Sequence, residues 1–138
     1  MKYFCTEDKR VGTCYHEFQK GKWDEHTFWK EDSLLLSDDV LVDLELGKLF
    51  RKSLQGYDPY GPVEVNKEQW LMLLEAANQA TDAQAEALQE ADAWVQECFV
   101  TEEVFTILPA PISFTRFARV SKSSVLLFSE GVMIKFAF

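Results

Sequence analysis

The chain has 138 residues, of which 47% are hydrophobic and 14% aromatic, and its 23 acidic and 14 basic residues give a net charge of −9. This length suits one domain, and the apolar content is too high for a disordered chain. The negative charge argues against nucleic-acid binding, because affinity for phosphates comes mainly from Lys and Arg. No apolar run is long enough to span a bilayer, and the acidic N-terminus lacks the apolar core of a signal peptide. We therefore expect a cytoplasmic protein that binds neither nucleic acid nor membrane.

The charge is unevenly distributed along the chain. Residues 1–111 hold 10 basic and 22 acidic residues, a net charge of −12, whereas residues 112–138 hold 4 basic and 1 acidic residue, a net charge of +3. An acidic surface speeds encounter with cationic surfaces, so basic proteins are the natural partners of the acidic part. The alternative is that the acidity only keeps the protein soluble.

Aromatic and charged side chains alternate closely in residues 1–32. This pattern is typical of short strands that bury one face, and Gly12 and Gly21 mark breaks between them. We predict strands near residues 2–5, 12–19 and 26–30.

The segment from Ser33 to Leu46 allows two interpretations. Its later apolar residues recur at every second position: Val40, Val42, Leu44 and Leu46. This period of two, with a polar turn at residues 37–39, predicts a β-hairpin. A helix starting at Ser37 is the competing interpretation, because it places Leu41, Leu44 and Lys48 on one face. We favour the hairpin, followed by a short helix over residues 48–54.

Two glycines and two prolines make residues 55–62 the clearest loop of the chain. Asn66 and Gln69 then have the spacing of a capping box, which predicts a helix over residues 67–79. Thr81 caps a second predicted helix, residues 82–98, and the two helices are either continuous or kinked near residue 80. The core-facing residues of the pair are predicted to be Trp70, Leu74, Leu88 and Val95.

The predicted helix over residues 82–98 carries five acidic residues and neither Lys nor Arg. It therefore cannot form ion pairs within itself, and its charge must be neutralised from other segments. A strand is predicted over residues 103–108, before the break at residues 109–111.

The basic segment after Pro111 contains a region ambiguous between strand and helix, residues 112–120, and a predicted β-hairpin over residues 125–136. It either completes the sheet, which we favour, or forms a poorly integrated tail. The sequence as a whole predicts a single α+β domain, residues 1–138, with residues 109–138 as its basic C-terminal segment. Its mostly antiparallel sheet, built from the N-terminal and C-terminal segments, is expected to pack against one long or two consecutive helices over residues 67–98.

The three cysteines, Cys5, Cys14 and Cys98, are an odd number without a CxxC pair, so we expect no disulfide. Cys5 and Cys14 with His16 and His26 match the ligand number of a zinc site, but their spacing fits no zinc module. Cys14 and His16 could also be read as a nucleophile and its base, but no oxyanion-hole motif accompanies them, so we do not expect these roles. We expect no catalytic residues, no metal and no cofactor.

A possible recognition surface remains in the acidic and tyrosine-bearing segments. Asp38, Asp39, Asp43 and Glu45 form the first group, and Tyr57, Asp58 and Tyr60 form the second. Tyrosines held in a proline-rich loop suit protein recognition, because they present rigid contact area at a low ordering cost. Alternatively, the acidic residues are solvated surface and both tyrosines fold back onto the core beside Trp70.

A small acidic chain without catalytic motifs resembles the immunity proteins that neutralise bacterial nuclease toxins. The loop of residues 57–62 leading into the helix that begins Glu68-Gln69-Trp70 is similar in style to such proteins. The resemblance implies that the protein covers the active site of a basic toxin, with carboxylates giving fast association and Tyr57 or Tyr60 slowing dissociation. We expect a monomer or weak homodimer. The alternatives are a small acidic secretion-type chaperone, acting as a dimer, and a small enzyme or ligand-binding domain with scattered site residues.

Overall fold

The computed structural model describes residues 1–110, and residues 1–108 form one compact unit. The predictions for residues 112–120 and 125–136 lie outside the described residues. Within these residues the fold combines a five-stranded antiparallel sheet with four α-helices, which confirms the predicted α+β class. None of the helices in this part of the chain is long and apolar enough to cross a membrane.

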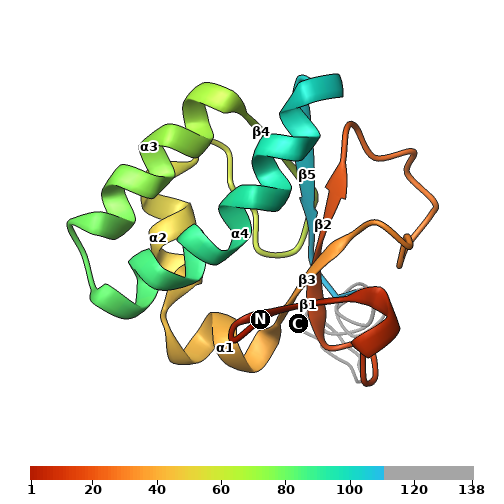
Figure 1. The fold of residues 1–138 in the computed structure, drawn as a ribbon, viewed down its shortest axis with the longest axis horizontal. Helices are drawn as coiled ribbons and strands as arrows, with labels where there is room; N and C mark the ends of the chain where they lie inside the picture. Colours follow the sequence, from red (N-terminus) through yellow and green to blue (C-terminus); the bar gives the residue numbers. More distant parts are fainter. Residues whose placement is uncertain (111–138) are drawn as a thin grey trace, which may run out of the picture. The chain divides into compact units, whose positions relative to one another are not determined.

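The sheet has the strand order β1-β3-β2-β5-β4, and every neighbouring pair is antiparallel. Its strands are β1 (Phe4–Thr6), β2 (Tyr15–Lys20), β3 (Leu34–Ser37), β4 (Val63–Asn66) and β5 (Val104–Leu108). The helices are η1 (Glu7–Lys9, a 3₁₀ turn), α1 (Asp38–Asp43), α2 (Leu46–Ser53), α3 (Lys67–Asn78) and α4 (Asp82–Thr101). Figure 1 shows α2, α3 and α4 on one side of the sheet and the segment between β2 and β3 on the other.

Aromatic side chains dominate the core between the sheet and the helices. Phe105 of β5 stacks on Phe18 of β2, with ring centroids 5.4 Å apart, and its edges meet Trp70 of α3 and Trp94 of α4. Such ring contacts add to the stabilisation that comes from the buried apolar area. The predicted core residues Trp70, Leu88 and Val95 are fully buried, and Leu74 is half-buried against the same cluster.

The two long helices form as the sequence predicts, and they are separate. Asn66 and Gln69 make both hydrogen bonds of the capping box at the start of α3, each at 2.8 Å. The Thr81 hydroxyl accepts a hydrogen bond from the Gln84 amide and caps α4. A short turn between the two helices lets α4 reverse direction and pack against α3 (Figure 1).

The predicted hairpin at residues 33–46 is wrong in its second half. Residues Leu34–Ser37 do form a strand, β3, but the chain then enters α1 directly. The Ser37 hydroxyl accepts a hydrogen bond from the amide of Val40, and Asp38 and Asp39 lie in the first helical turn, where carboxylates favour the positive end of the helix dipole. The polar residues expected to form a turn therefore start a helix, which was the competing interpretation.

Two further differences concern short segments. Residues 26–30 form no strand, whereas β4 at Val63–Asn66, which the sequence did not predict, forms one edge of the sheet. The strands expected near residues 2–5, 12–19 and 103–108 are present with shifted ends as β1, β2 and β5.

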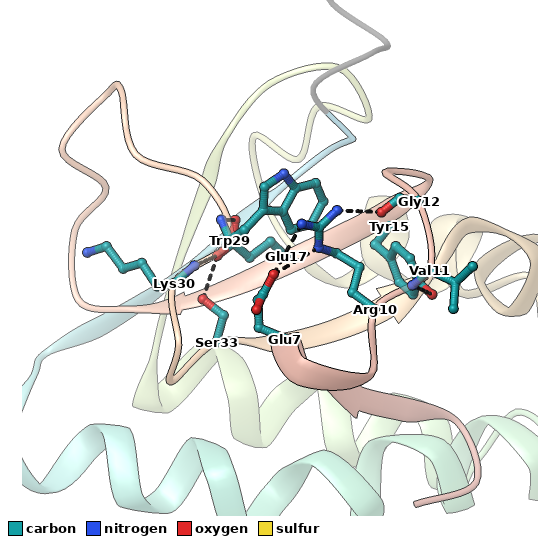
Figure 2. A network of polar contacts seen from close by, with 9 residues as sticks. All are labelled: Glu7, Arg10, Val11, Gly12, Tyr15, Glu17, Trp29, Lys30 and Ser33. Atoms are coloured by element: carbon teal, nitrogen blue, oxygen red, sulfur yellow. Dashed lines mark hydrogen bonds and ion pairs between the residues drawn. The ribbon is translucent and has the colours of Figure 1, made fainter.

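The face of the sheet opposite the helices is covered by the segment between β2 and β3. Glu17 of β2 is buried there, and its carboxylate accepts hydrogen bonds from the amides of Trp29 and Lys30, both at 2.9 Å, and from the Ser33 hydroxyl at 2.5 Å (Figure 2). The Arg10 guanidinium lies over the Trp29 ring, 4.2 Å from its centroid. We refer to residues 22–33 as the covering loop.

Candidate functional site

Helix α1 carries the first group of predicted site residues. Asp38, at its start, is half-buried, and its Oδ1 lies 2.9 Å from Nδ1 of His16 on β2. The amide of Asp38 also donates to the carbonyl of Cys14. These contacts attach the first turn of α1 to β2, so Asp38 has a structural contact that the sequence did not indicate.

Asp39 and Asp43 lie one helical turn apart, and both are exposed. Neither forms an ion pair or a side-chain hydrogen bond within the described residues. Val42 is next to them with 68% of its surface exposed, and no residue of α1 is fully buried. A shallow hollow of about 270 Å³ adjoins them and is lined by Leu41, Val42, Glu45, Gly47, Lys48 and Arg51. We call this hollow together with Asp39 and Asp43 the α1 surface.

Glu45 connects α1 to α2 in a left-handed backbone conformation, with φ 54°. A non-glycine residue in this region carries some strain, which tends to persist only where the surrounding structure requires it. The Glu45 carboxylate is exposed and pairs with Lys48, 3.0 Å away, so its charge is partly compensated. The α1 surface is thus acidic along α1 and basic along α2.

Tyr57 and Tyr60, in the loop that follows α2, differ in their exposure. Tyr57 is half-buried and its ring meets Phe50 edge-on at 5.7 Å, whereas Tyr60 is 55% exposed. Burial raises the pKa of the Tyr57 phenol; the charge of Arg51 opposes this effect, and the charges of Asp58 and Asp38 add to it. The Asp58 carboxylate accepts a hydrogen bond from the amide of Tyr60 and so stabilises the turn. Tyr57 therefore folds back on α2 and lies within electrostatic reach of Asp38, while Tyr60 faces solvent.

Four of the five acidic residues of α4 are used within the fold, and the exposed Asp82 at its start is the exception. Glu86 accepts a hydrogen bond from the Tyr3 hydroxyl, and Glu90 accepts from the amides of Lys2 and Tyr3. The contact with Tyr3, followed by the charge of Lys2, lowers the pKa of Glu86. Asp92 accepts from the Trp70 indole, and Glu97 pairs with Lys20. The predicted neutralisation by other segments is present for Glu86, which pairs with Lys2, and for Glu97, which pairs with Lys20.

The soft metal ligands of the N-terminal half are not brought together. His16 contacts Asp38, and His26 lies in the covering loop beside Asp24. Among the described residues, no group of three or more His, Cys, Asp or Glu side chains is placed to hold a metal ion. Cys5, Cys14 and Cys98 are all free thiols.

Comparison with protein-family models, with curated proteins and with solved structures finds no match to this chain.

The sequence does not single out the apolar part of the α1 surface. Leu41 and Val42 line its hollow, whereas the hairpin favoured from the sequence places both in a strand. A helix beginning at Ser37 places Asp39, Val42 and Asp43 on neighbouring positions of one face, since residues three and four apart are adjacent. The N-cap at Ser37 was the signal that could have revealed this surface.

Proposed function

We propose that this protein is a non-catalytic binding protein that docks a basic protein through the α1 surface. In this proposal it inhibits the partner by covering it, as the toxin-immunity proteins that the sequence resembles do. The observation that carries the proposal is the contrast between the carboxylates of α1 and α4. From Glu86 to Glu97 those of α4 serve contacts inside the fold, whereas Asp39 and Asp43 are exposed beside Val42 without a partner in the described residues.

Both parts of this surface have a physical role in the proposal. Exposed carboxylates attract a cationic partner and raise the association rate, an effect that falls as salt screens the charges. The exposed side chain of Val42 and the adjoining hollow supply apolar area that a partner can bury, which slows dissociation. Tyr60, exposed in the neighbouring segment after α2, provides the aromatic type of contact that is enriched in interfaces.

The test compares two baits in affinity capture from the cells that produce the protein, at low and at moderate salt. One bait is the natural chain and the other carries Asp39→Lys with Asp43→Lys. We expect the natural chain to retain a basic protein that is released as salt rises, and the charge-reversed bait to lose it. Purified partner and bait are then used to measure the association rate, which we expect to fall about tenfold or more on charge reversal.

A matched control separates the α1 surface from total charge. Glu75→Lys with Glu103→Lys makes the same change in net charge at two exposed positions elsewhere. Retention of the same proteins by all three baits, or equal loss with both double variants, would contradict a docking role for α1. Inhibition itself is tested by assaying the activity of the captured partner in the presence of each variant. Only the natural chain and the control variant are expected to inhibit the partner.

A further inference from the structure

A second, larger hollow lies on the face of the sheet opposite the helices, beside the edge strand β4. Its volume is about 510 Å³, within the range of small-ligand pockets. The lining residues come from three segments: Trp23 and Glu25 from the covering loop, Pro62 and Glu64 from the β4 region, and Thr106 from β5. We call this the β4 hollow.

A row of polar side chains crosses three strands at this hollow. Thr106 of β5 is paired with Glu64 of β4 on one side and with Gln19 of β2 on the other. Residues directly opposite one another in an antiparallel sheet point to the same face. Gln19, which is fully buried, therefore lies beside Thr106 on this face, and its Nε2 donates to the Thr27 carbonyl that also accepts from the Trp23 indole.

The donors of these side chains are already used. The Thr106 hydroxyl donates to the Gly21 carbonyl at 2.8 Å, and the Trp23 indole donates to Thr27 at 2.8 Å. What remains at the hollow are acceptors, the carboxylates of Glu25 and Glu64. Gln19 is fully buried and does not line the hollow, so its unpaired Oε1 atom is not offered to a ligand there.

A pocket that offers acceptors and an aromatic ring selects a guest that carries donors and positive charge. A guanidinium group has five N–H donors and no acceptor, and its planar shape stacks on an indole ring. An ammonium group has three donors and no flat face, so it satisfies fewer of these groups at once. We propose that the β4 hollow binds the guanidinium group of an arginine side chain.

The chain contains a weak competitor for this position. The Lys22 ammonium lies 3.8 Å from Oε1 of Glu64, and both side chains are well exposed. Exposed ion pairs of this length contribute little, so an incoming guanidinium can displace it. The inference deepens the proposed function, since it rests on that proposal for the statement that the arginine belongs to the basic partner. The chemistry of the hollow is testable without any partner.

The test is an NMR titration of the full chain with N-acetyl-arginine methylamide, which follows the indole N–H signal of Trp23 and the amide of Thr106. The corresponding lysine derivative and the neutral citrulline derivative, which keeps the shape of arginine without its charge, serve as comparison ligands. We expect saturable shifts with the arginine compound, weaker binding of the lysine compound and no saturation with citrulline. Equal binding of the citrulline compound, or the absence of saturable shifts, would overturn the proposal.

Variants locate the binding to the hollow. Glu64→Gln removes one carboxylate at an exposed edge position and is expected to weaken arginine binding roughly fivefold, whereas Glu75→Gln on α3 leaves it unchanged. Lys22→Gln removes the competitor and is expected to strengthen binding about twofold. Unchanged affinity in both Glu64→Gln and Glu25→Gln, with signals elsewhere preserved, would place the ligand outside the hollow.

A final comparison separates this inference from the proposed function. If the arginine derivative binds in the hollow but no basic protein is captured, the inference about the hollow is confirmed and the proposal of a basic partner fails. If a basic partner binds natural chain and Glu64→Gln equally, and the arginine derivative shows no saturation, the partner proposal stands and the inference about the hollow fails.

Discussion

The two faces of the sheet are covered by different kinds of contact. On one face, α3 and α4 press Trp70, Trp94 and other apolar side chains against Phe18 and Phe105. On the opposite face, hydrogen bonds to Glu17 (Figure 2) and to Gln19 attach the covering loop. Stabilisation is therefore spread over many apolar contacts on the helix face and concentrated in a few polar side chains on the loop face.

This comparison predicts the largest loss of stability on the helix face. Phe105→Ala removes the ring that contacts Phe18, Trp70, Trp94 and Phe99, and leaves a cavity among them. We expect the free energy of unfolding to fall by about 3–5 kcal/mol, measured by urea or guanidinium denaturation. Val100→Ala on α4, at a position 82% exposed, is the control and is expected to change little. A loss below about 1 kcal/mol for Phe105→Ala would mean that the ring is not central to the core.

A smaller and more local effect is expected on the loop face. Glu17→Gln keeps the shape of the side chain but replaces one acceptor oxygen with an N–H₂ group that faces N–H and O–H donors. We expect a loss of about 1–3 kcal/mol, together with faster hydrogen exchange at the amides of Trp29 and Lys30. Glu31→Gln, at an exposed position of the same loop, is the control. Uniformly faster exchange across the sheet and helices would show that Glu17 supports the whole fold and not the loop.

The smallest effect on stability is expected when the pH is lowered. Hydrogen bonds from the Thr27 hydroxyl and from the amides of His26 and Thr27 hold the pKa of Asp24 well below its ordinary value of 3.8. Because the pKa of Asp24 is lower in the folded than in the unfolded state, its ionisation stabilises the fold at pH values above the unfolded-state pKa. This stabilisation is lost as the pH falls from about 4 through the folded-state pKa. We expect an NMR titration of the Asp24 carboxyl group to show a midpoint below 3.8.

The variant Asp24→Ala supplies the corresponding control. It removes the acceptor, so the signals of His26 and Thr27 are expected to lose their dependence on pH below about 4 while the core signals keep theirs. An ordinary midpoint for Asp24 in the natural chain would indicate that these hydrogen bonds do not persist in solution.

The loop face also carries the β4 hollow, and this follows from the same difference. The hollow is lined by polar side chains of this face, among them Glu64 and Thr106, whereas aromatic and aliphatic side chains fill the space between the sheet and the helices. The α1 surface has another origin, since α1 buries none of its residues fully and exposes Val42 between two carboxylates.

The predicted site residues have different environments in the fold. Asp39 and Asp43 lie on one exposed face, but Asp38 contacts His16 and Tyr57 packs on Phe50. From the local sequence, all four residues are expected to be equally exposed, because each has a polar or amphipathic side chain. Contacts with side chains of other elements, His16 on β2 and Phe50 on α2, distinguish Asp38 and Tyr57 from the other two.

What the sequence determined by itself is local. The capping box of Asn66 and Gln69, the cap at Thr81 and the apolar spacing that follows each of them define α3 and α4, because their hydrogen bonds join residues three or four positions apart.

The tertiary structure decided the elements for which local signals conflict or are weak. Residues 38–46 suit a strand or a helix by their pattern, and β4 is only four residues long after a proline. The packing of α1 beside β2 through Asp38 and His16, and the pairing of β4 with β5, resolve these cases. Short elements gain too little from their own hydrogen bonds to form alone, so distant partners determine their conformation.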